Sequence, residues 1–285
     1  MCASPFRTLL ALCLTSATVA GCTPATEPAP APPAAAAAAS PAAPTAHISR
    51  ATQLQAFLTE RYGKPARLSG NWRGPWTQDG QARPTDWHIC AEQPVVSGDG
   101  WQQLVAVCGE LVDASHADPG TIDFYVLRPN TERFEVAAEL TGSSYGSSGF
   151  PGSVSIVRAG SDFYGFRVES GWYGQGTSLE SQSLILPGPT GLVDTGSVRS
   201  HIDNTAAYDC NDPEQEEDCR THMFTVNFAL RFDDRDRSAR TWPLLIEESG
   251  SDCGGKQVRL EHRFTLDPTT WAYRFPESLQ RESCQ

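Results

Sequence analysis

Apolar and polar side chains alternate along several segments beyond residue 130, and this alternation constrains the fold more than any other feature of the chain. Residues 134–140, 164–169, 224–232 and 258–266 each place apolar side chains at every second position. Successive side chains of a β-strand point to opposite faces of its sheet, so such alternation is typical of half-buried antiparallel strands. Clusters of glycine, proline, asparagine and aspartate separate the segments as turns. The pattern predicts an all-β fold of antiparallel sheets.

A strand, a turn containing proline and a second strand recur three times along the chain. The three units cover residues 124–134, 184–192 and 264–271. Repeating β units of this size indicate the blades of a propeller or the hairpins of a closed barrel, although such hairpins also recur by chance in β domains. We therefore expect an irregular propeller-like or closed-barrel arrangement.

One helix is expected before the strands begin. Ser49 is a suitable N-cap, and Gly63 followed by Pro65 ends the helical pattern. The helix should pack on the β domain through one apolar face. That face consists of Leu54, Phe57, Leu58 and Tyr62.

The first residues have the pattern of a secretory signal. Arg7 is the only charge before position 27, and the apolar run 8–20 is too short to span a membrane. The run ends at residues 19–22 in Val-Ala-Gly-Cys, which resembles the bacterial lipobox. The resemblance implies cleavage before Cys22 and lipidation of its thiol, which would anchor the chain to a membrane. An ordinary secretory signal with an unrelated cysteine is the alternative.

The residue after Cys22 and the segment that follows indicate where the domain is held. In Gram-negative lipoproteins, an aspartate directly after the lipidated cysteine usually keeps the protein in the inner membrane. Residue 23 is threonine, so by analogy we expect this protein in the outer membrane, facing the periplasm. Alanine, proline and threonine make up nearly all of the following segment, which predicts an extended tether. The expected organisation is a signal peptide over 1–21, a lipidated cysteine with its tether over 22–46, and one disulfide-stapled β domain over 47–285.

The charge of the chain excludes one class of partner. The net charge is −12, and Lys64 and Lys256 are the only lysines. A protein without a basic patch is not expected to bind nucleic acid.

The cysteines predict disulfides. Nine cysteines are present, and six of them lie beyond the tether. An even number in an exported domain predicts three bridges, which 15 pairings would satisfy. A zinc site is the alternative, but no C-x-x-C pair occurs. We expect sequence neighbours to pair, as Cys90–Cys108, Cys210–Cys219 and Cys253–Cys284.

One segment formally matches a hydrolase motif. Residues 142–146 read Gly-Ser-Ser-Tyr-Gly, the G-x-S-x-G pattern with Ser144 as nucleophile. That motif acts where a strand turns sharply into a helix, and the sequence predicts another strand after it. His262 lies on the apolar side of its strand, where a histidine is more often a hydrogen-bonded core residue than a catalyst. We expect no catalytic residue.

Residues 209–219 hold six carboxylates, five of them between Cys210 and Cys219. Calcium would neutralise some of them, with Asp209, Asp212 and Glu214 as candidate ligands, although their spacing is not that of an EF-hand. A solvated acidic turn and a docking loop for a basic partner are the alternatives. No other cofactor is expected.

Two segments combine glycine with aromatic residues. One contains Tyr145 and Phe150, and the other contains Trp172 and Tyr173. Exposed, such aromatic residues form binding hot spots or platforms on which sugars stack. If they are buried instead, they close one end of the β core. We expect these aromatic residues to be buried.

Three functions fit this sequence. The first is a non-catalytic envelope lipoprotein that binds a protein or a cell-wall glycan, as an inhibitor would. The second is a structural or assembly lipoprotein, and the third is a periplasmic serine hydrolase that uses Ser144. In its lipobox, tether, cysteines and β repeats the chain resembles uncharacterised β-rich lipoproteins of Gram-negative bacteria and, on architecture alone, β-propeller-like immunity lipoproteins. That resemblance implies the first function.

Overall fold

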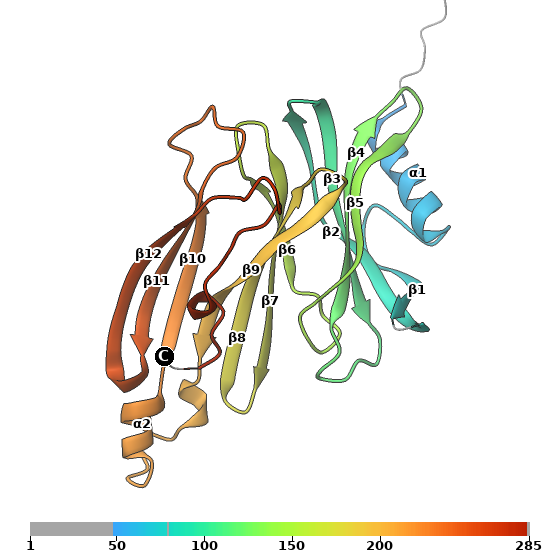
Figure 1. Ribbon diagram of the computed structural model, residues 1–285. Helices are drawn as coiled ribbons and strands as arrows, with labels where there is room; N and C mark the ends of the chain where they lie inside the picture. Colours follow the sequence, from blue (N-terminus) through green and yellow to red (C-terminus); the bar gives the residue numbers. More distant parts are fainter. Residues whose placement is uncertain (1–47, 79, 284–285) are drawn as a thin grey trace, which may run out of the picture. The chain divides into compact units, whose positions relative to one another are not determined.

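The computed structural model describes residues 48–78 and 80–283, which belong to one compact unit (Figure 1). The expected all-β fold is confirmed, because these residues form two antiparallel sheets with barrel-like curvature. The five-stranded sheet has the order β1-β2-β3-β4-β5, with β1 Trp72–Gln78, β2 Gln81–Ser97, β3 Gly100–Leu111, β4 Gly120–Pro129 and β5 Phe134–Tyr145. The seven-stranded sheet has the order β12-β11-β10-β9-β8-β7-β6, with β6 Ser153–Arg158, β7 Tyr164–Gly174, β8 Thr177–Pro187, β9 Leu192–Asp203, β10 Thr225–Phe232, β11 Leu244–Asp252 and β12 Lys256–Phe264.

The expected N-terminal helix is α1, Arg50–Tyr62. The Thr52 amide donates to Ser49 Oγ over 3.2 Å, which satisfies one amide of the first turn. Gly63 ends the helix with a φ of +84°, a conformation that favours glycine. The apolar face of the helix packs on the five-stranded sheet, with Leu54, Phe57 and Leu58 buried.

Three apolar clusters lie in series through the domain. The first joins α1 to one face of the five-stranded sheet, the second lies between the two sheets, and the third fills the hollow of the seven-stranded sheet. In β3, Val105 and Val107 belong to the first cluster and Leu104 and Ala106 to the second. A strand buried on both faces loses the alternation of polar and apolar residues, which is why β3 carries an unbroken apolar run over residues 104–108.

Two of the three expected disulfides are present. Cys90–Cys108 joins the neighbouring strands β2 and β3, and Cys210–Cys219 closes the acidic segment. The expected Cys253–Cys284 bridge involves a residue outside the described part of the chain. The lipobox at Cys22 and the tether also lie outside it.

Two of the three proline units form hairpins. β4 pairs with β5, and β8 pairs with β9. After β12 the chain makes only a bridge between Asp267 and Ala272 and then continues without a further strand to residue 283. We call residues 265–283 the C-terminal segment; it includes the short helix η3, Glu277–Leu279.

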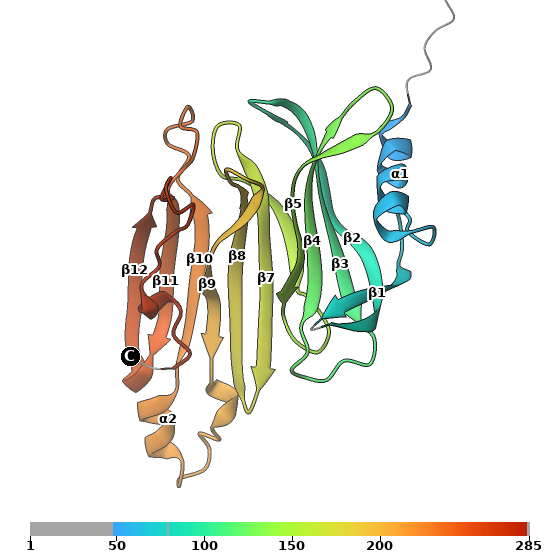
Figure 2. The same cartoon turned by 45° about the vertical axis from the view of Figure 1, so that its right-hand side comes forward.

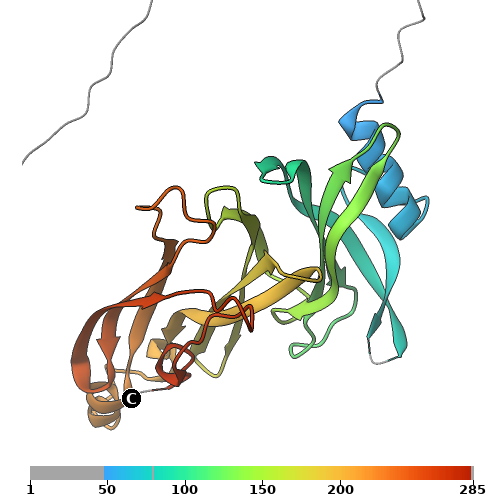
Figure 3. The same cartoon turned by 45° about the horizontal axis from the view of Figure 1, so that its top comes forward.

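The C-terminal segment lies in a gap within the seven-stranded sheet. β9 and β10 pair only where Thr225, Val226 and Asn227 face residues 201–203, so the rest of β9 diverges from β10. Figure 2 shows the segment, in dark red, crossing the face of these strands, and Figure 3 shows the sheet curling around it. Its apolar side chains fill the hollow; those buried there are Leu266, Tyr273 and Leu279.

Candidate binding site

A tight turn presents two of the aromatic residues singled out from the sequence. Trp172 and Tyr173 are near the end of β7, and the chain reverses into β8 through Gln175 and Gly176. Both turn residues have positive φ, 52° and 75°, as a two-residue hairpin turn of type I′ requires. A Cβ atom at Gly176 would lie 2.4 Å from the Ala207 amide nitrogen, so only glycine fits there. The turn therefore fixes the end of β7.

The expectation that these aromatic residues close the core is wrong for three of the four. Phe150 is 59% exposed, Tyr173 is 59% exposed and Trp172 is 38% exposed. Tyr145 is half-buried, its ring lies edge-on to Phe124, and burial raises the pKa of its hydroxyl. We call Phe150, Trp172 and Tyr173 the aromatic end.

The loop that carries Phe150 is held against β7. Ser147 Oγ donates to the Gly171 carbonyl over 3.1 Å. A Cβ atom at Gly152 would lie 2.2 Å from the Glu169 carbonyl oxygen, so the loop backbone touches the strand. The His116 ring lies 6.1 Å from the Trp172 ring, centroid to centroid. These contacts hold the aromatic end in one place.

A groove adjoins Trp172. Its first hollow has a volume of about 440 Å³, and a second hollow of about 290 Å³ shares Ser181, Arg199 and Glu282 with it. We call the two hollows together the trough. The first hollow is lined by Gly146, Ser170, Gly171, Trp172, Leu179, Ser181, Arg199 and Glu282.

Arg199 is fixed in the middle of the trough. Its guanidinium donates to Ser181 Oγ over 2.8 Å and to the Arg281 carbonyl over 3.3 Å, and it forms an ion pair with Glu282. Its side chain is only 17% exposed, whereas that of Glu282 is 67% exposed. The trough thus presents a held cation and an accessible anion.

The C-terminal segment supplies Glu282 and is itself anchored by a buried ion pair. Arg281 Nη2 lies 2.7 Å from Glu248 Oε1, and both side chains are less than a tenth exposed. The guanidinium also lies over the Phe228 ring, 5.2 Å from its centroid. Glu248 Oε2 is 3.2 Å from His262 Nε2. His262 is therefore hydrogen-bonded at the edge of the core, as its place on the apolar side of the strand indicates.

Ser144 lacks the surroundings of a nucleophile elbow. It lies within β5, where it pairs with Thr121 of β4, and it is exposed. The chain continues into a loop and then into β6, with no helix between the serine and β6. His116, beside this loop, is within 3.2 Å of Ser148 Oγ rather than of Ser144.

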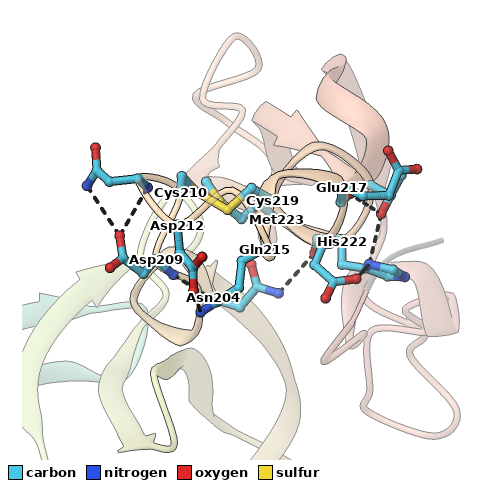
Figure 4. Close-up of a disulfide and its surroundings, with 12 residues drawn as sticks. Asn204, Asp209, Cys210, Asp212, Gln215, Glu217, Cys219, His222 and Met223 are labelled. Carbon is cyan, nitrogen blue, oxygen red and sulfur yellow. Dashed lines mark hydrogen bonds and ion pairs between the residues drawn. A yellow bond between two sulfur atoms is a disulfide. The ribbon is translucent and has the colours of Figure 1, made fainter.

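The acidic segment folds on itself (Figure 4). Its second half continues into a short helix, α2, Glu216–His222, which the sequence pattern does not predict. Asp209 Oδ1 accepts from the Asn211 amide and Asp212 Oδ1 from the Glu214 amide, both over 3.0 Å. Such turns are the ordinary use of aspartate in loops. Within residues 48–78 and 80–283, no three or more His, Cys, Asp or Glu side chains are grouped to hold a metal ion.

Comparison with known proteins gives this chain no family. It matches no protein-family model, no curated protein and no solved structure. In the described part of the chain, no helix has the length and apolar character needed to cross a membrane. The function must therefore be argued from the site itself.

The sequence indicates the residues of the aromatic end but does not predict the trough. Ser181, Arg199 and Glu282 lie on β8, β9 and the C-terminal segment, far apart along the chain. Ser181 and Arg199 are cross-strand partners in the β8–β9 hairpin, whereas Glu282 joins them only because the C-terminal segment lies beside β9, and no motif predicts that. The one local signal is the glycine pattern around Trp172, which the sequence reading did use.

Proposed function

We propose that this chain is a membrane-anchored, non-catalytic protein of the cell envelope that holds a cell-wall glycan or a protein partner at the aromatic end. One observation carries the proposal: three large aromatic side chains are exposed on two turns that are held together, and one of them, Trp172, lines a trough. Aromatic side chains often dominate the energy of binding surfaces.

The sequence and the disulfides support the location. The lipobox pattern ending at Cys22 supports a lipid anchor, and Thr23 supports the outer membrane, facing the periplasm. The Cys90–Cys108 and Cys210–Cys219 bridges fit an oxidising compartment. If the partner is a wall-degrading enzyme, the protein would act as its inhibitor, as an immunity protein does.

A photo-cross-linking residue in place of Tyr173 tests the proposal. We expect a benzophenone amino acid at this position, in the full-length protein in its natural host, to form a covalent adduct after irradiation. The matched control carries the same residue in place of Leu260, which is 53% exposed on β12, away from the aromatic end. Gel electrophoresis resolves the adducts. No adduct at 173, or equal yields at 173 and 260, would show that the aromatic end is not the binding surface.

A further inference from the structure

We propose that the trough beside Trp172 binds a linear, uncharged oligosaccharide. This inference rests on the proposed function, because it names the ligand class of the same site. It is carried by four features of the trough: a flat aromatic platform, polar groups of balanced charge, an elongated form and the lack of a free strand edge along β9.

The platform is the indole of Trp172. A Cβ atom at Gly174 would lie 2.4 Å from Cζ2 of this ring, so the indole lies directly over the glycine backbone. The ring lines the trough and remains 38% exposed. An aromatic ring beside a polar groove suits the carbon–hydrogen face of a sugar ring, which is apolar while the ring edge carries hydroxyl groups.

The polar groups of the trough match hydroxyl groups better than an ion. Arg199 and Glu282 pair with each other, so their formal charges cancel. A guanidinium offers five donors and a carboxylate about four acceptor sites, and the pair uses only part of them. The serine hydroxyls at Ser170 and Ser181 both donate and accept. A ligand with many hydroxyls and no net charge satisfies such a set.

The form of the trough favours a linear ligand. Its two hollows, of about 440 and 290 Å³, share Ser181, Arg199 and Glu282 and so continue into each other. The first hollow alone falls within the range of small-molecule sites. The second extends the surface from Trp172 to Gln280 of the C-terminal segment. A chain of sugar rings would cover both hollows.

An extended peptide fits less well, because peptides in grooves beside sheets commonly add as a further strand and need an unpaired edge. The edge of β9 beside the trough is covered. The Thr195 carbonyl accepts from the Tyr273 amide over 2.7 Å, and the Ser197 carbonyl accepts from Gln280 Nε2 over 3.2 Å. The C-terminal segment therefore already takes two of the carbonyls that an added strand would need.

Titration calorimetry of the full-length protein in detergent tests the inference. The probes are short oligomers of N-acetylglucosamine and of glucose, both linear and uncharged. We expect at least one to bind, and Trp172→Ala to weaken that binding by about tenfold or more, the effect of losing a central aromatic contact. Gly174→Ala should weaken it similarly, because the added methyl group displaces the indole without removing it. Val96→Ala, at a side chain 65% exposed on β2, is the matched control and should bind as the wild type does.

The outcomes separate this inference from the function on which it rests. Binding that both variants weaken and the control preserves supports the inference. If neither oligomer binds while the cross-linker at 173 forms a specific adduct in cells, the oligosaccharide is wrong and the proposed function stands. If neither experiment detects a ligand, both fail. Oligomer binding that Trp172→Ala and Gly174→Ala leave unchanged also overturns the inference, since the sugar then binds elsewhere.

Discussion

The hydroxyl of Tyr62, the last residue of α1, donates to Oδ2 of the buried Asp123 over 2.7 Å and is 2.9 Å from the Tyr125 hydroxyl. The Gly142 amide donates to the other carboxylate oxygen over 2.6 Å. Burial raises the pKa of Tyr125 to about 12 and raises that of Tyr62 well above its usual range, so both hydroxyls keep their protons at neutral pH. Asp123 thus accepts hydrogen bonds from several groups, and the one from Tyr62 fixes the end of α1 to the five-stranded sheet.

Tyr62→Phe removes one of these donors and keeps the ring. We expect it to lower the free energy of unfolding by about 1–3 kcal/mol, because a buried carboxylate oxygen then loses its shortest hydrogen bond. Chemical denaturation followed by circular dichroism measures the change. The control is Tyr173→Phe, at a side chain 59% exposed, which should leave stability unchanged. Equal stabilities of Tyr62→Phe and wild type would show that the network does not hold the helix.

Among the structural elements, the two described disulfides have different surroundings. Cys90–Cys108 joins β2 and β3 across 18 residues, and Cys108 is buried in the cluster between the sheets. Cys210–Cys219 closes nine residues of an exposed segment. The first bridge restricts the unfolded chain more and also fills core volume.

Replacing Cys90 and Cys108 together by alanine should lower the free energy of unfolding by about 3 kcal/mol or more. Replacing Cys210 and Cys219 by alanine should cost less, because the closed loop is shorter and lies in an exposed segment. Denaturant titration of both double variants measures the two costs on one scale. A larger cost for the second pair would contradict the inference that the Cys90–Cys108 bridge stabilises the fold more.

The strands that carry alternating residues were predictable, and so was α1 with its cap at Ser49, because these signals are local. α2 was missed because its seven residues in an acidic, disulfide-closed segment carry no apolar face. The gap between β9 and β10 was missed because it depends on strand pairing over long distances in sequence. The C-terminal segment has no periodicity, so nothing local shows that it fills that gap. The trough could not be predicted for the same reason.

For the molecule as a whole, the layers explain why the aromatic end is available for binding. Helix, five-stranded sheet, seven-stranded sheet and C-terminal segment each bury their apolar faces against the next layer. The core therefore does not need Phe150, Trp172 and Tyr173, which extend beyond it at the turns. A rigid scaffold with functional side chains on its loops is a common arrangement in binding proteins.

Hydroxyl-radical footprinting of the wild-type protein, on intact host cells and after purification, tests most directly whether the aromatic end is occupied in the envelope. We predict that Phe150, Trp172 and Tyr173 are oxidised several-fold less in cells than in the purified protein, whereas Val96 and Leu260, both exposed elsewhere, are oxidised equally in the two samples. Equal oxidation of all five side chains in both samples would contradict the account, because the surface proposed to hold a ligand would then be open to water in the cell.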